Sequence, residues 1–328
     1  MDRQTPEASL VTPETARLFV DRLDSDHVLI DEPLANHTTF KIGGPADAIL
    51  LPTSTEDVAW IVQTCQEFSL PLRFMGLGSN ILASDNGARG VIVKLAENLA
   101  AISVDGNAIT AQAGASNEAV AKAALDASLS GYEFASGIPG SIGGAAIMNA
   151  GAYEGEFKDV ATSLTCLTPE AQPVEVSADQ ADWGYRHSMM MDKGYVVLSA
   201  TIALTPAPQA EIKARMDDLR QRRESKQPLE MPSAGSTFKR PKGYFAGKLI
   251  QDAGLKGYTV GGAQISTKHS GFVVNTGNAT AADVMELIQD VHDKIFAAEG
   301  VHMEPEVRLW GFEDKQAIPN SHRKTRGL

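Results

Sequence analysis

Residues 45–80 read PADAILLPTSTEDVAWIVQTCQEFSLPLRFMGLGSN. The apolar stretch that ends at Pro52 predicts a strand, and Ser54 followed by Asp57 predicts the capped start of a helix. The apolar positions of that helix fall on one face, at Val58, Ile61, Val62 and Cys65. A second strand at 71–75 then runs directly into a glycine loop at 76–80. This order predicts a βαβ unit whose loop lies where α/β folds bind ligands.

Length and composition restrict the class of protein. The chain has 328 residues, which favours two or three domains, and its 43% hydrophobic content excludes wholesale disorder. A net charge of −12 disfavours a nucleic-acid partner. No apolar run is long enough to span a membrane, and residues 1–20 do not resemble a secretory signal. We therefore expect a soluble cytoplasmic protein without a membrane or nucleic-acid partner, whose two cysteines, Cys65 and Cys166, are buried and inert.

The rest of the chain alternates between helical and strand patterns. Helices are predicted from Thr12, over 116–128, 210–226 and 245–253, and from Thr280. Strands are predicted over 91–95, 101–113, 160–168, 173–177, 195–204, 259–266, 272–275 and 306–310. The two prolines of TPAPQ (205–209) mark the best domain boundary, and the polar tail 313–328 is expected to fray.

Two glycine-rich segments are the first candidates for a binding site. Residues 76–80, GLGSN, match neither the dinucleotide fingerprint nor a phosphate-cradling loop, although two glycines allow an anion close to the backbone. Residues 131–153 hold six glycines in an apolar context. A flat cofactor whose pyrophosphate contacts both segments is one interpretation, and tight turns with dense packing are the other.

Single side chains are ambiguous on their own. Arg186 could clamp a carboxylate or lie on the surface, and Ser236 is an ordinary turn serine unless something binds beside it. Strand alternation places Glu306 and Arg308 on one face, where a solvated ion pair is the usual explanation. Lys226 ends a cationic run that could contact a phosphate. The histidines show no metal-ligand spacing, so no metal site is predicted.

Seven segments together resemble the UDP-N-acetylenolpyruvoylglucosamine reductase (MurB) family in its short form. The matching segments are NHTTFKIGGPAD (36–47), GLGSN (76–80), GIPGSIGGAAIMNAGAY (137–153), YRHS (185–188), AGSTFKRP (234–241), FAGKLIQDAGLKG (245–257) and EPEVRLWG (304–311). The resemblance implies an α+β protein with a two-subdomain FAD-binding fold of the vanillyl-alcohol-oxidase (PCMH) type and a C-terminal α/β substrate domain. The expected parts are an N-terminal helical extension (1–35), the FAD-binding domain (36–207), the substrate domain (208–312) and a polar tail (313–328).

The resemblance also implies an activity. NADPH would reduce a non-covalent FAD, and flavin N5 would pass hydride to the enolpyruvyl group of a UDP-sugar, giving UDP-N-acetylmuramate for peptidoglycan synthesis. Residues 76–80 contain no histidine for covalent flavin attachment, and we expect a monomer. The alternatives are an FAD-dependent alcohol or sugar oxidase of the same fold, and a flavin- or nucleotide-sugar-binding module without catalysis.

Site residues follow from the matching motifs. Arg186, Ser236 and Glu306 match the catalytic positions, with Ser236 as the proton donor. Substrate contacts are expected at Tyr185, Lys226 and Arg240. Cofactor contacts are expected at Gly76, Gly78, Ser79, Asn80, Gly137, Ile138, Pro139, Gly140, Ser141, Gly143, Gly144, Asn149, Ala150 and Gly151.

The chemistry explains why these residue types would be needed. Hydride addition to an enol ether leaves an enolate-like charge, which Arg186 and a hydrogen bond from Glu306 would stabilise. Glu306 can donate only if it holds a proton, and the neighbouring Arg308 opposes that. The short form lacks the loop that covers the substrate in the long form, so no covering residue is predicted.

Overall fold

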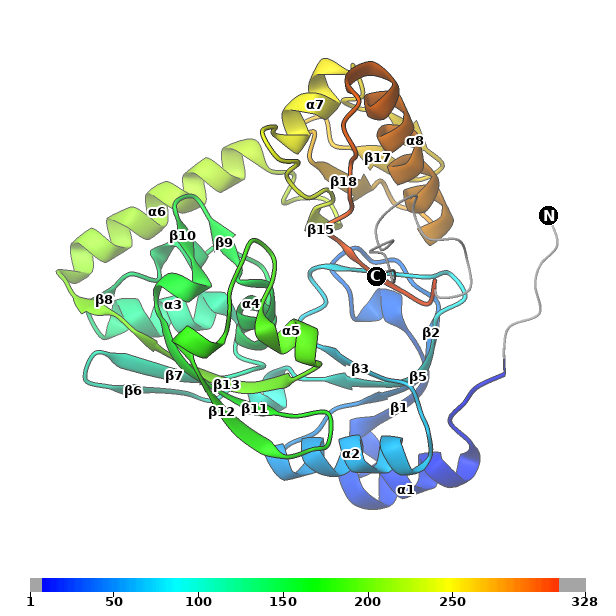
Figure 1. Cartoon of the computed structure of the whole chain (residues 1–328), viewed down its shortest axis with the longest axis vertical. Coiled ribbons are helices and arrows are strands. Elements are labelled where there is room, and N and C mark those ends of the chain that lie inside the picture. Colours follow the sequence, from blue (N-terminus) through cyan, green and yellow to red (C-terminus); the bar gives the residue numbers. More distant parts are fainter. Residues whose placement is uncertain (1–7, 313–328) are drawn as a thin grey trace, which may run out of the picture.

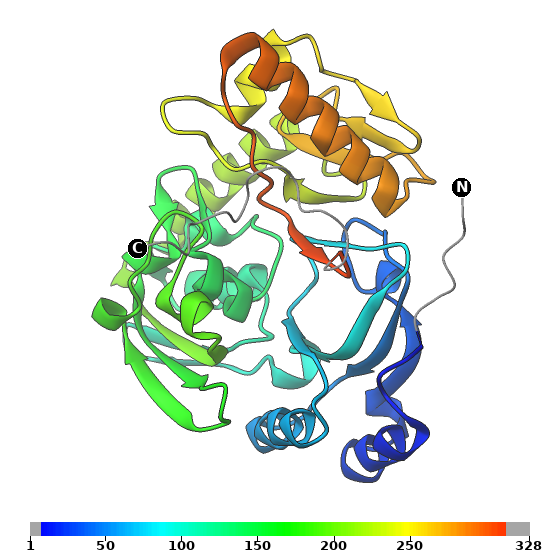
Figure 2. The same cartoon turned by 45° about the vertical axis from the view of Figure 1, so that its right-hand side comes forward.

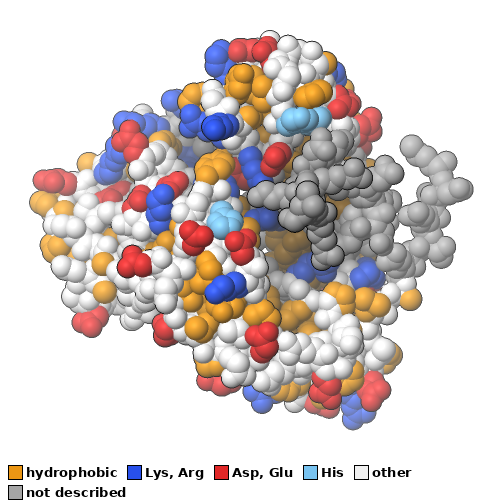
Figure 3. Space-filling view, in the orientation of Figure 1, with side chains coloured by type: hydrophobic (Ala, Val, Ile, Leu, Met, Phe, Trp, Pro, Cys, Tyr) orange, Lys and Arg blue, Asp and Glu red, His pale blue; other side chains and the backbone are white. Residues whose placement is uncertain are grey.

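The computed structural model describes residues 8–312, so the predicted tail at 313–328 lies outside the described residues. Three groups of helices and strands surround the centre of the molecule (Figure 1). No helix within residues 8–312 combines the length and the apolar character needed to cross a bilayer. On the face shown in Figure 3, acidic and basic side chains are interspersed, without a single large basic patch.

The first group contains the predicted βαβ unit. Its sheet has the order β1 (Val28–Pro33), β2 (Pro45–Leu50), β5 (Ala88–Lys94) and β3 (Leu72–Met75). Strands β2 and β3 both run parallel to β5, which lies between them, and β1 is antiparallel to β2. The predicted helical extension at 1–35 therefore also contributes an edge strand.

Two helices lie beneath this sheet in the view of Figure 2, namely α1 (Pro13–Leu23) and α2 (Thr55–Glu67). Thr12 caps α1, and the Ser54 hydroxyl accepts a hydrogen bond from the backbone of Asp57 at the start of α2, as predicted. Their apolar faces form one core with the sheet, in which Phe19 and Ile61 are fully buried. The predicted strand–helix–strand unit is confirmed, and the 76–80 loop follows the carboxyl end of β3.

The second group is an antiparallel sheet of five strands. Their order is β12 (Pro173–Ser177), β11 (Ala161–Leu167), β13 (Val196–Ala203), β7 (Ala108–Gln112) and β6 (Ile102–Asp105). The prediction of one strand over 101–113 is wrong, because β6 and β7 form a hairpin whose turn contains Gly106 at φ +56°. The predicted helix at 116–128 is confirmed as α3 (Asn117–Asp126), which packs into the core of this sheet.

The glycine-rich segment 131–153 is partly helical, which the sequence pattern did not indicate. It contains α4 (Ile142–Met148), capped by Ser141, and two short strands follow, β9 (Gly151–Ala152) and β10 (Gly155–Glu156). Gly143 allows this helix to lie against the neighbouring strand region, since a Cβ there would be 2.9 Å from the Cβ of Ala113. Glycine disfavours helices intrinsically, so close packing rather than propensity forms α4.

The predicted boundary at 205–209 is more structured than a linker. Strand β14 (Thr205–Pro206) pairs with β8 (Leu129–Ser130), and α6 (Gln209–Lys226) starts directly after Pro208. Helix α6 crosses from the second group toward the third (Figure 1).

The third group contains a four-stranded antiparallel sheet and two helices. The strands have the order β15 (Ser233–Ser236), β18 (Phe272–Asn275), β17 (Ala263–Ile265) and β16 (Thr259–Val260). The prediction of one strand over 259–266 is wrong, because Gly261 at φ +51° turns the chain between β16 and β17. Helices α7 (Ala246–Asp252) and α8 (Ala281–Glu299) share its core, and Gly300 in the left-handed conformation ends α8.

The end of the described chain returns to the first group. Strand β19 (Arg308–Trp310) pairs in parallel with β4 (Ile81–Ala83), which directly follows the 76–80 loop. The predicted strand at 306–310 therefore begins two residues later than expected. This pairing places Glu306 and Arg308 beside the first glycine loop.

Candidate active site

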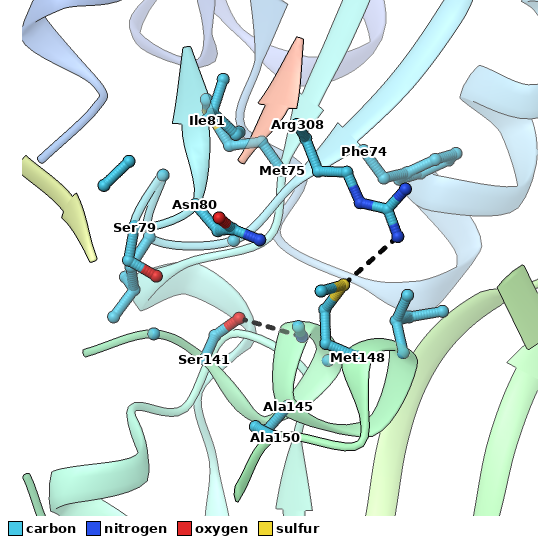
Figure 4. A pocket seen from close by; sticks show the side chains of 18 of the residues that line it. Phe74, Met75, Ser79, Asn80, Ile81, Ser141, Ala145, Met148, Ala150 and Arg308 are labelled. Atoms are coloured by element: carbon cyan, nitrogen blue, oxygen red, sulfur yellow. Dashed lines mark hydrogen bonds between the residues drawn. The ribbon is translucent and has the colours of Figure 1, made fainter. Parts of the chain in front are cut away.

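A cavity of about 1510 Å³ opens between the three groups. Both predicted glycine segments line it, and Figure 4 shows Ser79 and Asn80 on one side facing Ser141 and Ala145 of the α4 region on the other. Residues close to the end of the described chain, Glu306 and Arg308, line the same cavity. The fold thus gathers segments that are far apart in the sequence.

The first glycine loop is packed so tightly that side chains are excluded at two positions. A Cβ on Gly76 would lie 2.1 Å from the Ser141 hydroxyl oxygen. Gly78 has φ +66°, and its Cβ would lie 2.0 Å from the carbonyl oxygen of His37. The loop therefore presents bare backbone to the cavity, which suits a ligand that binds peptide N–H groups.

The two glycine segments contact each other directly. The Ser79 hydroxyl donates a hydrogen bond of 2.9 Å to the carbonyl of Pro139, and Gly140 adopts φ +137° beside it. Behind them, the Asn117 amide donates to the carbonyls of Ile138 and Gly140 at 3.3 and 3.2 Å. Asn117 also lines the cavity, and it could not be singled out from the sequence, because nothing near it in the chain indicates these contacts.

Most of the expected cofactor residues line this cavity. They are Gly76, Gly78, Ser79, Asn80, Ile138, Pro139, Gly140, Ser141, Gly143, Gly144, Ala150 and Gly151. Two others do not line it: Gly137 packs against the side chain of Arg223, and Asn149 is fully buried. The Asn149 amide donates to Glu156 and to the carbonyl of Gly184, so it supports the end of α4 from behind.

Arg186 and Glu306 meet on the cavity wall although 120 residues separate them. The Arg186 Nε donates to the Glu306 Oε1 at 2.6 Å, and the Tyr185 hydroxyl donates to Oε2 at 3.4 Å. The Arg186 backbone has φ +55°, a left-handed conformation that costs free energy in a residue other than glycine. The backbone N–H of Glu306 donates to the carbonyl of Thr237 at 2.7 Å, which fixes the backbone that carries this carboxylate.

Ser236 ends strand β15 and lines the same cavity. Gly235 precedes it at φ +74°, where the register of β15 against β18 shifts. Thr237 follows and is locked to β18, since its hydroxyl accepts a hydrogen bond from the backbone of Val273 at 3.0 Å. Among the residues that the structure describes, none hydrogen-bonds the Ser236 hydroxyl, so it is available to a ligand in the cavity.

The expected substrate residues lie farther out and are less closely grouped. The Tyr185 hydroxyl accepts a hydrogen bond of 3.3 Å from the backbone of Arg240, whose guanidinium stacks on Phe245 at 3.9 Å from the ring centroid. Burial raises the pKa of Tyr185, and the nearby charge of Glu306 adds to that shift. Lys226 is exposed at the end of α6. None of Tyr185, Lys226 and Arg240 is among the residues that line the cavity, so their expected role as substrate contacts stays a prediction.

Two further side chains line the cavity, those of Arg223 and Cys65. Arg223 of α6 is buried beside Gly137, and this burial lowers the pKa of its guanidinium. Cys65 of α2 also lines the cavity, and burial raises the pKa of its thiol to about 12. The prediction that Cys65 and Cys166 are buried is confirmed.

Two parts of the chain match known protein families. Residues 46–177 match a family described as an FAD binding domain. Residues 227–310 match the C-terminal domain of UDP-N-acetylenolpyruvoylglucosamine reductase.

Curated relatives extend this similarity over most of the chain. The UDP-N-acetylenolpyruvoylglucosamine reductase of Agathobacter rectalis is 51% identical over 296 residues, covering 87% of this chain and 94% of the relative. That of Exiguobacterium sibiricum is 47% identical over 304 residues, covering 93% of this chain and 100% of the relative. The crystal structure of the reductase (MurB) from Thermus caldophilus is similar with a TM-score of 0.75 and 32% identity, covering 86% of this chain and 98% of that one.

Proposed function

Because this chain belongs to the UDP-N-acetylenolpyruvoylglucosamine reductase family of FAD-containing oxidoreductases, we propose that it uses NADPH to reduce the enolpyruvyl group of UDP-N-acetylglucosamine-enolpyruvate to UDP-N-acetylmuramate. One observation carries the proposal. Arg186, Glu306 and Ser236 lie on the wall of one cavity together with both glycine segments.

The residues of the cavity fit FAD. Gly78 and Gly140 are packed against His37 and Ser79, where a side chain would collide, and both line the cavity. At these positions only backbone faces the cavity, which suits a pyrophosphate. Beyond the loops, Ile81, Met148 and Met75 give the wall an apolar character suited to a flat ring (Figure 4). When bound, FAD supplies hydride from N5.

Arg186 would stabilise the negative charge that develops on the enolpyruvyl carboxylate as hydride arrives at the double bond. Its contact with Glu306 fixes the guanidinium in one orientation. In this contact Glu306 accepts the hydrogen bond. We therefore assign Glu306 the role of orienting Arg186 as a carboxylate, which needs no proton, unlike the donor role considered from the sequence.

Ser236 would donate the proton that completes the reduction. Hydride and one proton add across the carbon–carbon double bond, so the hydroxyl must give its proton to the second carbon and regain one from water. A serine hydroxyl is a weak acid, but the enolate-like carbon is strongly basic. The absence of a competing acceptor within residues 8–312 leaves this hydroxyl free to turn toward the substrate.

The test separates the two half-reactions. Purified protein should be yellow, lose its flavin colour on addition of NADPH, and recover it on addition of the enolpyruvyl UDP-sugar. Ser236→Ala should be bleached by NADPH at the normal rate but should not be reoxidised by the sugar. A colourless protein that takes up no FAD would refute the proposal, and oxygen consumption with simple alcohols or sugars would favour an oxidase instead. A monomeric state and a cytoplasmic location stay predictions.

A further inference from the structure

Arg308 carries a positive charge into the cavity that no acidic side chain of the described chain neutralises by direct contact. It is the first residue of β19, and its guanidinium points toward Met148 in Figure 4. An Nη atom of Arg308 lies 3.3 Å from the sulfur of Met148 and 2.9 Å from that of Met191. Within residues 8–312, no ion pair joins Arg308 to a carboxylate.

These contacts do not match the chemistry of a guanidinium. Arginine prefers to form two parallel hydrogen bonds to a carboxylate or phosphate, whereas a thioether is only a weak acceptor. Glu306 is the nearest acidic group in the sequence, but its two oxygens already accept from Arg186 and Tyr185. Arg308 is exposed within the open cavity, and desolvation by the surrounding wall lowers its pKa while the charge of Glu306 partly opposes that shift. An arginine in a protein nevertheless stays protonated. The positive charge is therefore fixed and available to a ligand.

The surroundings of Arg308 indicate what kind of ligand that is. A pyrophosphate is better placed at the glycine loops, where backbone N–H groups can solvate it. The guanidinium lies instead among Phe74, Met75, Ile81 and Met148, which offer apolar contact to a flat ring (Figure 4). A ring that is neutral when oxidised and anionic when reduced would suit an apolar wall that holds one cation.

We propose that Arg308 supplies a fixed positive charge to the pyrimidine edge of the flavin ring and thereby stabilises the charge that the ring carries after it accepts a hydride. A hydride brings two electrons and one proton, so the ring gains one negative charge when no second proton follows. Arg308 stays protonated throughout and forms no covalent bond. The inference rests on the proposed function, since it requires bound FAD.

The experiment measures the flavin itself in the absence of the UDP-sugar. Arg308→Met should make the midpoint potential of bound FAD more negative. It should also raise the Kd for sulfite by about tenfold or more, because sulfite adds to oxidised flavin and leaves a negative charge on the ring. Arg308→Lys keeps the positive charge, so its midpoint potential and its affinity for sulfite should stay close to those of the unaltered protein. Lys239→Met is the matched control, because Lys239 is a partly exposed cation of the third group that pairs with Glu304 at 3.2 Å, and it should change neither property.

The outcomes distinguish this inference from the proposed function. An unaltered protein that binds no FAD would defeat the proposed function itself. Normal potential and sulfite affinity in Arg308→Met, with a raised KM for the UDP-sugar, would overturn the inference and assign Arg308 to the substrate carboxylate. Loss of oxidised FAD from both Arg308→Met and Arg308→Gln, with unchanged thermal unfolding, would also overturn it and assign Arg308 to cofactor retention.

Discussion

Arg186 stands in a turn where its backbone adopts φ +55° and where Gly184 and His187 form an isolated bridge. The strain of this conformation is compensated by the contact with Glu306, which lies 2.6 Å away on the same cavity wall. A lysine would keep the positive charge. It could not reproduce the planar guanidinium, which contacts Glu306 and in the proposed reaction would also contact the carboxylate of the substrate.

Arg186→Lys should therefore lower the rate of flavin reoxidation by the enolpyruvyl sugar about 10²-fold, the usual loss when one stabilising donor is removed. Flavin reduction by NADPH should proceed at its normal rate. Stopped-flow measurement of the two half-reactions checks this. His187→Ala is the neighbouring control, because His187 pairs with Asp192 at the surface and should leave both rates intact.

The cysteines give a prediction about pH. Burial raises the pKa of the Cys65 and Cys166 thiols from 9.0 to about 12. The thiolate is the reactive form, so a raised pKa leaves almost none of it at pH 8. The folded protein should consume less than one equivalent of a disulfide reagent over minutes at pH 8, and two equivalents after unfolding in guanidinium. Rapid labelling of the folded protein would show that either thiol is accessible.

Helix α4 shows how an element can depend on close packing more than on propensity. Gly143 and Gly144 are adjacent in it, but a Cβ on Gly143 would lie 2.9 Å from the Cβ of Ala113, whereas the nearest atom to a Cβ on Gly144 is 3.8 Å away. Gly143→Ala should lower the free energy of unfolding by about 1–3 kcal/mol through overpacking. Gly144→Ala should raise it by up to about 1 kcal/mol through helix propensity. Urea unfolding without added FAD measures both, and equal effects would contradict this account of α4.

The difference between local sequence signals and packing contacts that are distant in the chain explains which elements could be predicted from the sequence. The caps at Thr12, Ser54 and Thr280 are local signals, and each begins a helix where the pattern indicates. Helix α4 was missed because its stabilising contact with Ala113 lies far away in the chain. The hairpins β6–β7 and β16–β17 were each predicted as one strand. The pattern of apolar residues does not show that the backbone turns with a positive φ at Gly106 and Gly261.

At the scale of the whole molecule, the third group is tied to the first through Asp85. Its carboxylate accepts hydrogen bonds from the backbone N–H groups of Ala281 and Ala282 at 2.7 and 3.0 Å, in the first turn of α8. An acidic group at a helix N-terminus is favourable because of the unsatisfied N–H groups there. This contact helps to set the position of the sheet that carries Ser236 against the cavity.

Asp85→Ala should therefore lower the free energy of unfolding by about 1–2 kcal/mol. It should reduce the rate of the Ser236-dependent half-reaction more than it reduces the affinity for FAD. Chemical unfolding and flavin titration check the two parts. Asp252→Asn, which removes only an exposed pair with Lys248, should change neither measurably, and an equal loss in both variants would refute the role of Asp85.

The candidate site could be predicted from the sequence only where motifs matched a family. Arg186, Ser236 and Glu306 were grouped by that resemblance, and the structure places all three on one cavity. Asn117 and Arg308 could not be assigned roles, because their contacts depend on which segments lie side by side. The parallel pairing of β4 with β19 is such a contact, and no local pattern encodes it.

That pairing has a consequence for how the protein matures during translation. The Asn80 amide reaches the carbonyl of Glu306 across 226 residues of chain. A polypeptide still emerging from the ribosome lacks β19, and with it Glu306 and Arg308, until some three hundred residues have been made. The last described strand must therefore fold back onto β4 before Glu306 and Arg308 can join the cavity wall, so the wall is completed only by a contact of very high sequence separation.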